Sequence, residues 1–226
     1  MPALARQAPF VGRESELALL LARLAEVRAG TGVAALISGE PGIGKTRLLG
    51  ELAAHARAAG ALVLLGHAYD GEGGLPYGPF VEALRSLLRS SPSDDLRGSL
   101  GSGGVAAAIA LLVPELYDRF PDLVSGRLDS PELDRNRLFD AIVDLLFAAA
   151  HAATGGLLLV LEDLHWADAA SLALLQHLGR RLAEAPLLLT ATHRNVAPPL
   201  QDPLQAVLAE LARQQPVDRL QLQPLQ

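Results

Sequence analysis

Residues 39–46 carry the pattern with the clearest chemistry in the chain. They read Gly-Glu-Pro-Gly-Ile-Gly-Lys-Thr, which fits G-x-x-x-x-G-K-[ST], and they lie between a predicted strand and a predicted helix. The glycines let the backbone curl, so that successive N–H groups from about Gly42 to Thr46 point at one anion. The positive end of the following helix dipole adds to this attraction. We call residues 39–46 the phosphate loop, because the pattern predicts a phosphate-binding site.

Lys45 is the single lysine among the 19 basic residues of the chain, and all the others are arginine. This usage indicates that a guanidinium fork would not serve at position 45. A compact ammonium there can reach the β- and γ-phosphates of a nucleotide, and the Thr46 hydroxyl is suited to ligate Mg²⁺. An ordinary Gly/Pro turn between a strand and a helix is the alternative, and the rarity of lysine argues against it.

A pair of acids follows another apolar run. Residues 157–161 read Leu-Leu-Leu-Val-Leu and are followed by Glu162 and Asp163. Ligands of parallel sheets bind at the carboxyl ends of the strands, so we expect one acid to hold Mg²⁺ and the other to orient an attacking water. By position Glu162 takes the metal side and Asp163 the water side, although the two roles can be exchanged. The alternative, a solvated acidic loop, is disfavoured by the phosphate loop upstream.

Three polar or aromatic residues come directly after the acidic pair. His165 could be a metal ligand or a base, but no cysteine and no second histidine at a suitable spacing supports a zinc site. We therefore expect His165 to have a structural, hydrogen-bonding role. Trp166 is interpreted as a packing residue, and Asp168 as the N-cap of the next helix.

A third apolar run, residues 187–192, leads into His193 and Arg194. If the sheet is parallel, Arg194 emerges at the same edge as the phosphate loop. Its guanidinium fork could then contact a γ-phosphate. A solvated loop arginine is the alternative.

The elements that must position these residues alternate between helix and strand. Helical spacing predicts helices at residues 13–29, 45–59, 79–89, 105–112, 131–153, 168–182 and 203–213. Short apolar runs predict strands at residues 33–38, 61–65, 157–161, 186–192 and 217–222. Residues 90–104, rich in Ser, Gly, Pro and Asp, predict a surface loop. The order predicts a three-layer α/β fold with a mainly parallel five-stranded sheet and a helical insertion at about 67–130, between the second and third strands.

Composition limits the function classes further. The chain of 226 residues is 50% hydrophobic and 19% charged, so it can bury a core. A net charge of −6 argues against nucleic-acid binding by this segment, and the lack of cysteine excludes disulfides and thiolate sites. The apolar runs are far shorter than the ~20 residues that span a bilayer, and the first ten residues have no signal-peptide core. We expect a soluble, cytoplasmic chain without membrane contacts.

Five segments of the chain occur in the same order in one known group of proteins. They are FVGRESEL at 10–17, the phosphate loop, GHAYDGEGGLPYGPF at 66–80, LEDLHWAD at 161–168 and THR at 192–194. From about residue 10 to residue 222, the chain resembles the AAA-type ATPase domain of STAND signalling proteins. The resemblance is strongest to large bacterial LuxR-family transcriptional regulators and related ATPase-linked cyclases and kinases.

This resemblance implies a P-loop NTPase fold with a RecA-like sheet, in which a third strand separates the phosphate-loop strand from the acidic strand. It also implies ATP, ADP and Mg²⁺ as ligands, a sensor role for Arg194, and an adenine near residues 11–13. The expected metal-binding residues are Thr46, Glu162 and Asp163, and the expected catalytic residues are Asp163, Glu162 and Arg194. The expected nucleotide-binding residues are Val11, Gly12, Arg13, Gly39, Glu40, Pro41, Gly42, Ile43, Gly44, Lys45, Thr46 and Arg47.

The family continues into a helical lid, a winged helix, sensor repeats and, in the regulators, a helix-turn-helix, none of which is found in residues 1–226. We therefore expect one AAA-type ATPase domain: a fragment, a truncated product or a solitary module. Self-association or output domains in a longer parent protein are further expectations. The leading interpretation is an ATP-binding switch with slow hydrolysis. The alternatives are a small-molecule P-loop kinase, an origin-recognition-like AAA protein acting on DNA, and an interaction module that needs no nucleotide.

Overall fold

The fold is a five-stranded parallel sheet between helices, as a computed structural model shows. The structure describes residues 10–70, 76–101, 105–123, 131–194, 202–214 and 216–224. The side chains of residue 95 and of residues 131–134 are not described. The strands are β1 (Val33–Ser38), β2 (Leu62–His67), β3 (Leu157–Glu162), β4 (Leu187–His193) and β5 (Val217–Gln221). Their spatial order is β2-β3-β4-β1-β5, and every neighbouring pair is parallel. The predicted α/β class is confirmed, and β4 separates β1 from β3 as the resemblance implied.

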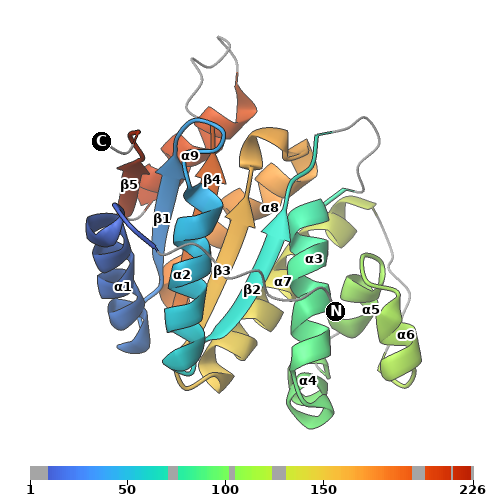
Figure 1. The fold of residues 1–226 in the computed structure, drawn as a ribbon. Coiled ribbons are helices and arrows are strands. Elements are labelled where there is room, and N and C mark those ends of the chain that lie inside the picture. The colour runs from blue at the N-terminus through green and yellow to red at the C-terminus, as the bar shows by residue number, and fades with distance from the viewer. Residues whose placement is uncertain are drawn as a thin grey trace, which may run out of the picture.

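The described part of the chain contains nine α-helices. Figure 1 shows how they are arranged around the sheet. They are α1 (Glu14–Arg28), α2 (Lys45–Ala58), α3 (Gly78–Ser90), α4 (Ser93–Leu100), α5 (Val105–Ala110), α6 (Glu115–Arg119), α7 (Pro131–Ala152), α8 (Ala169–Arg181) and α9 (Pro203–Gln214). Two short 3₁₀ turns, η1 (Leu164–Trp166) and η2 (Leu182–Glu184), follow β3 and α8. Among these helices, none is both long and apolar enough to cross a membrane.

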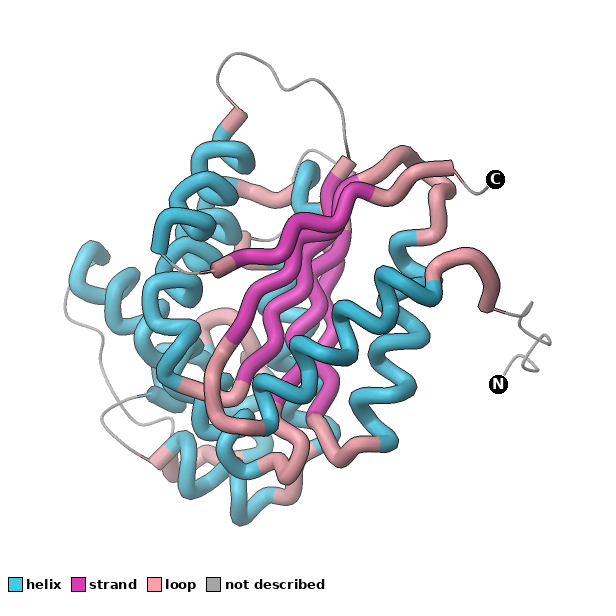
Figure 2. Tube along the Cα trace, turned by 90° about the vertical axis from the view of Figure 1, so that its left-hand side faces the viewer, coloured by secondary structure: helices cyan, strands magenta, loops and turns pink. Residues whose placement is uncertain are grey.

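Alternation along the strands divides the core into two layers. In β1, Ala34 and Leu36 join a core cluster with α7, α8 and α9, whereas Ala35 and Ile37 join a second cluster with α1 and α2. Successive strand side chains point to opposite faces, so a strand covered on both sides is apolar at every position. All six residues of β3 are buried. Figure 2 shows the sheet enclosed by helices on either side, which confirms the three-layer arrangement.

The helical insertion between β2 and β3 is confirmed, but one part of it was predicted wrongly. Residues 93–100, expected within a surface loop, form α4. The four-residue spacing of Leu96 and Leu100 explains the difference, because both side chains are almost fully buried in the core cluster beneath α3 and α7. Burial of two leucines overrides the weak helical propensity of the surrounding Ser, Asp and Gly. Residues 71–75, 124–130 and 195–201, which carried parts of the predicted insertion and the strand-end loop, lie outside the described residues.

A close approach between β2 and α3 gives a test of this packing. A Cβ atom on Gly66 would lie 1.9 Å from the backbone oxygen of Pro79, whereas one on Gly50, in the middle of α2, would meet no atom within 4 Å. We expect Gly66→Ala to lower the free energy of unfolding by about 2–3 kcal/mol, because the clash is with backbone that cannot rotate away. The matched Gly50→Ala should raise it by up to about 1 kcal/mol. Urea denaturation measures both, and equal stabilities of the two variants would contradict this packing.

Candidate functional site

The residues singled out from the sequence gather at one edge of the sheet. The phosphate loop follows β1, the acidic pair ends β3, and Arg194 follows β4. Because these strands are parallel neighbours, their carboxyl ends meet at the same edge, which is the upper edge in Figure 1. The sheet therefore brings together segments that are more than a hundred residues apart in the chain.

The phosphate loop has the backbone conformation that its glycines permit. Gly42 and Gly44 have φ angles of 76° and 102°, in the left-handed region that side chains rarely adopt. A Cβ on either glycine would meet no protein atom within 4 Å, so the space beside the loop is open. Helix α2 starts at Lys45, with the Leu48 N–H donating to Gly44 O at 3.0 Å. The N–H groups of the first turn of α2 and its positive dipole end thus face the same open space.

Lys45 is nearly buried and is held by the loop itself. Its side chain donates from Nζ to Gly39 O at 2.9 Å and to Glu40 O at 3.0 Å, and the residue is 8% exposed. Burial lowers the pKa of the Lys45 ammonium; the negative charges of Asp163 and Glu162 oppose this shift, and the positive charge of Arg194 adds to it. The two acids and the arginine therefore lie within the electrostatic range of Lys45.

The acidic pair divides into a buried and an exposed member. Glu162 is 5% exposed, and its Oε2 accepts a hydrogen bond from Thr46 Oγ1 at 2.5 Å. Asp163 is about half exposed, has a φ of 57°, and its N–H donates to Thr192 Oγ1 at 2.9 Å. A left-handed aspartate is uncommon, and such strain persists only where the surroundings impose it. The Thr46 hydroxyl and the Glu162 carboxylate, which lie within hydrogen-bonding distance of each other, are oxygen ligands of the kind that Mg²⁺ prefers.

A chain of side chains that the sequence analysis missed supports Glu162 from β2 and α3. His67, the last residue of β2, pairs in register with Glu162, and its Nε2 lies 3.4 Å from Glu162 Oε1. On its other side, Glu82 of α3 accepts from the His67 N–H at 3.0 Å and lies 3.1 Å from His67 Nδ1. Tyr69 donates to Glu82 at 2.9 Å, which raises the pKa of the phenol. His67 was missed because β2 was expected to end at residue 65, two residues before the histidine.

The segment before α1 reaches the phosphate loop from outside. Arg13 is 7% exposed, and its guanidinium donates to Ile43 O and to Gln223 O and forms an ion pair with Glu16 at 2.9 Å. Arg13 thus connects the loop to the segment after β5. Val11 is 61% exposed and Gly12 has a φ of 74°. The placement of these three residues near an adenine stays a prediction.

Arg47 lies on the first turn of α2, but its side chain extends along the helix and away from the phosphate loop. It pairs with Glu51, one turn further along the helix, at 2.6 Å. An i,i+4 ion pair of this kind lies on the helix surface. Only the backbone N–H of Arg47 is therefore a candidate for contact with a ligand in the loop.

The residues after β3 correct one expectation. Both ring nitrogens of His165 are buried without a hydrogen-bond partner among the described residues, so the expected hydrogen-bonding role is wrong there. Burial lowers the pKa of His165, which favours the neutral imidazole. Trp166, interpreted from the sequence as a packing residue, is 38% exposed, and the Arg194 Cζ lies 5.3 Å from the centroid of its ring.

Asp168 caps α8, as expected. Its Oδ1 accepts from the N–H groups of Ala170 and Ser171, each at 2.9 Å. We expect Asp168→Ala to lower the free energy of unfolding by about 1 kcal/mol, because two N–H groups at the helix start lose their acceptor. Asp168→Ser, which keeps a capping oxygen, is the matched control in denaturant unfolding. A loss of the same size in both variants would show that the cap is not the cause.

Comparisons with known proteins agree with this arrangement. The sequence model of the AAA ATPase domain matches residues 9–190. The chain is also 34% identical over 200 residues to a protein of Rhizobium meliloti (strain 1021) that is described only as uncharacterized. That alignment covers 82% of this chain and 18% of the relative, so this chain spans about a fifth of the relative's length. With four-fifths of its residues matched by that model, the chain belongs to the AAA ATPase domain family.

Proposed function

We propose that this domain binds ATP with Mg²⁺ at the upper edge of the sheet and acts as a nucleotide-dependent switch with slow hydrolysis. One observation carries the proposal: the phosphate loop, with Lys45 and Thr46 at the start of α2, lies directly against Glu162 at the end of β3. An anion cradle opposite a hydroxyl–carboxylate pair fits a triphosphate and its divalent cation. Membership of the AAA ATPase family supports an ATP-binding module.

Each part of the loop has its own task in this proposal. The N–H groups from Gly42 to Arg47 donate to the phosphate oxygens, together with the dipole of α2. Lys45 exchanges its bonds to the loop carbonyls for the β- and γ-phosphates. Gly39, Glu40, Pro41 and Ile43 shape the curl, and Val11, Gly12 and Arg13 lie on the adenine side.

The acidic pair divides its roles by burial. Glu162, whose Oε2 already contacts Thr46, is assigned to the metal, while the more exposed Asp163 orients the attacking water. Mg²⁺, when bound, neutralises charge that develops on the phosphates. His67 and Glu82 hold the second oxygen of Glu162 in place. The fork of Arg194 faces the γ-phosphate from the end of β4.

We further propose that the domain works within a larger regulator of the LuxR-like STAND type. The resemblance in five ordered segments supports the type of regulator, and the relative, of which the alignment covers 18%, supports only the larger size. In such a protein, ATP holds the domain in one arrangement, and hydrolysis or exchange releases it to act on output domains or on another copy. The proposed place of action is the cytoplasm. Phosphate transfer to a small acceptor at many turnovers per second would instead identify a kinase.

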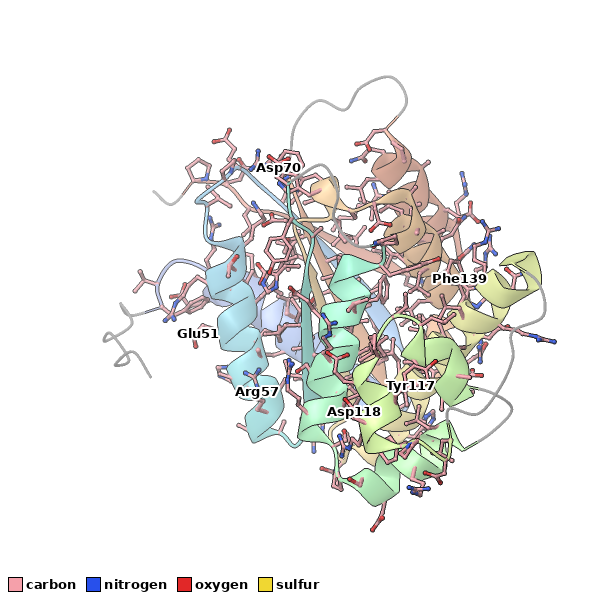
Figure 3. All side chains as sticks on the ribbon, turned by 90° about the vertical axis from the view of Figure 1, so that its right-hand side faces the viewer. Glu51, Arg57, Asp70, Tyr117, Asp118 and Phe139 are labelled. Carbon is pink, nitrogen blue, oxygen red and sulfur yellow. The ribbon has the colours of Figure 1, made fainter. Side chains whose placement is uncertain are left out.

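The first test replaces the ammonium. We expect Lys45→Ala to weaken ATP affinity by ~100-fold or more, because a nearly buried cation leaves the phosphate site. Arg57→Ala, near the carboxyl end of the same helix, removes an exposed cation and should leave the affinity unchanged (Figure 3). Isothermal titration calorimetry measures both. Equal affinities for wild type and Lys45→Ala would refute the site.

The second test separates the two acids. Asp163→Asn should lower the hydrolysis rate by about 100-fold but change ATP affinity by less than about threefold, because it alters water activation alone. Glu162→Gln should weaken ATP binding in the presence of Mg²⁺ and flatten its dependence on Mg²⁺ concentration. Phosphate release and calorimetry across a Mg²⁺ series measure these effects. Equal losses of binding and turnover in Asp163→Asn would assign Asp163 a structural role.

A further inference from the structure

Arg194 is a cation without a carboxylate partner in the part of the chain that the structure describes. Its guanidinium lies over the ring of Trp166, with Cζ 5.3 Å from the centroid. Arg194 follows β4, at the same edge of the sheet as Lys45 at the start of α2. Two like charges therefore face one region of the site, which is an arrangement that a bound anion would relieve.

The backbone of Trp166 is tied to that of the acidic pair. Trp166 ends the short turn η1, and its backbone N–H donates to the backbone oxygen of Asp163 at 2.9 Å. Its ring also contacts the His165 ring, at a centroid distance of 4.9 Å. With 38% of the residue exposed, the indole is only partly buried. The turn thus presents a partly exposed aromatic face beside the phosphate site.

Stacking on an aromatic face suits an arginine that has to bind an oxyanion. The attraction between a guanidinium and an indole acts through the ring face, whereas the N–H donors point outward in the guanidinium plane. A stacked arginine can therefore keep its fork free for a bidentate contact with phosphate. Without the ring, the long side chain would lose more conformational freedom on binding.

We propose that Trp166 is a positioning residue for Arg194, a platform whose ring face holds the guanidinium ready for the γ-phosphate of a bound nucleoside triphosphate. This inference rests on the proposed ATP-binding function. It assigns Trp166 a role in discriminating ATP from ADP, because ADP has no γ-phosphate for the fork to contact. The sequence alone predicted only a packing role for Trp166.

The test compares affinities for AMP-PNP and for ADP by calorimetry. Trp166→Leu should weaken AMP-PNP binding by about three- to tenfold and leave ADP binding unchanged, since the cation–π contact is lost. Trp166→Phe, which keeps an aromatic face, should recover most of the loss. Tyr117→Leu, which removes an exposed aromatic on α6, is the matched control and should change neither affinity (Figure 3).

A double-mutant cycle with Arg194→Ala separates this role from simple packing. If Trp166 acts through Arg194, Trp166→Leu should have no further effect on AMP-PNP affinity in the Arg194→Ala background. The same loss in both backgrounds would overturn the inference, as would an unchanged ratio of the two affinities in Trp166→Leu. Failure of the wild type to bind either nucleotide would instead refute the proposed function.

A second measurement changes the electronic character of the Trp166 ring without replacing the residue, so it does not depend on the folding of the substituted variants. Trp166 is the only tryptophan in the chain, so fluorinated tryptophan can be incorporated at this position alone. Fluorine reduces the negative potential of the ring face with little change in shape. AMP-PNP affinity should fall stepwise with the number of fluorines while ADP affinity stays constant, and a flat series would contradict the platform.

Discussion

The hydrogen bond from Thr46 Oγ1 to Glu162 Oε2 joins the first turn of α2 to the end of β3. This bond connects a helix on one face of the sheet to a central strand, and both Thr46 and Glu162 lie at the edge where the parallel strands end. The rest of the site is arranged around it: the phosphate loop ends at Thr46, and Asp163 and Trp166 follow Glu162. The parallel sheet makes this contact possible, since no local interaction could join residues separated by more than a hundred positions.

The charges around this contact are arranged for exchange with a ligand. Lys45 satisfies its ammonium with two carbonyls of its own loop, and burial shifts its pKa downward. A polyphosphate would replace two neutral acceptors with charged oxygens, which form stronger hydrogen bonds. In the proposed function, Arg194, which lies over an aromatic ring, offers a second cation to the same ligand. We therefore expect the site to bind a ligand with several negative charges more tightly than one with a single charge.

Much of this could be predicted from the sequence because the signals are local. The spacing of glycines around a solitary lysine identified the phosphate loop, and the apolar run before Glu162 identified β3. One feature of the strand order, a third strand between β1 and β3, came from the resemblance, because apolar runs alone carry no information about which strands are neighbours. Helix α4 was missed, since its two buried leucines stand in a polar, glycine-containing context.

Contacts that depend on register or on packing between elements could not be found in this way. His67 meets Glu162 only because β2 and β3 pair residue by residue, and Glu82 arrives from α3. Two further features likewise appear only once the strand ends are brought together: Arg194 lies over the Trp166 ring, and the His165 nitrogens have no hydrogen-bond partner among the described residues. These are contacts within and around the candidate site, and their chemistry refines the proposed function.

The most direct test of the central claim is calorimetric titration of ATP into the folded wild-type chain, with Mg²⁺ and again after chelation of Mg²⁺, at two temperatures. We expect saturable binding at a single site that weakens when the metal is removed. Absence of saturable heat at both temperatures, from protein whose fold is verified by circular dichroism, would contradict it.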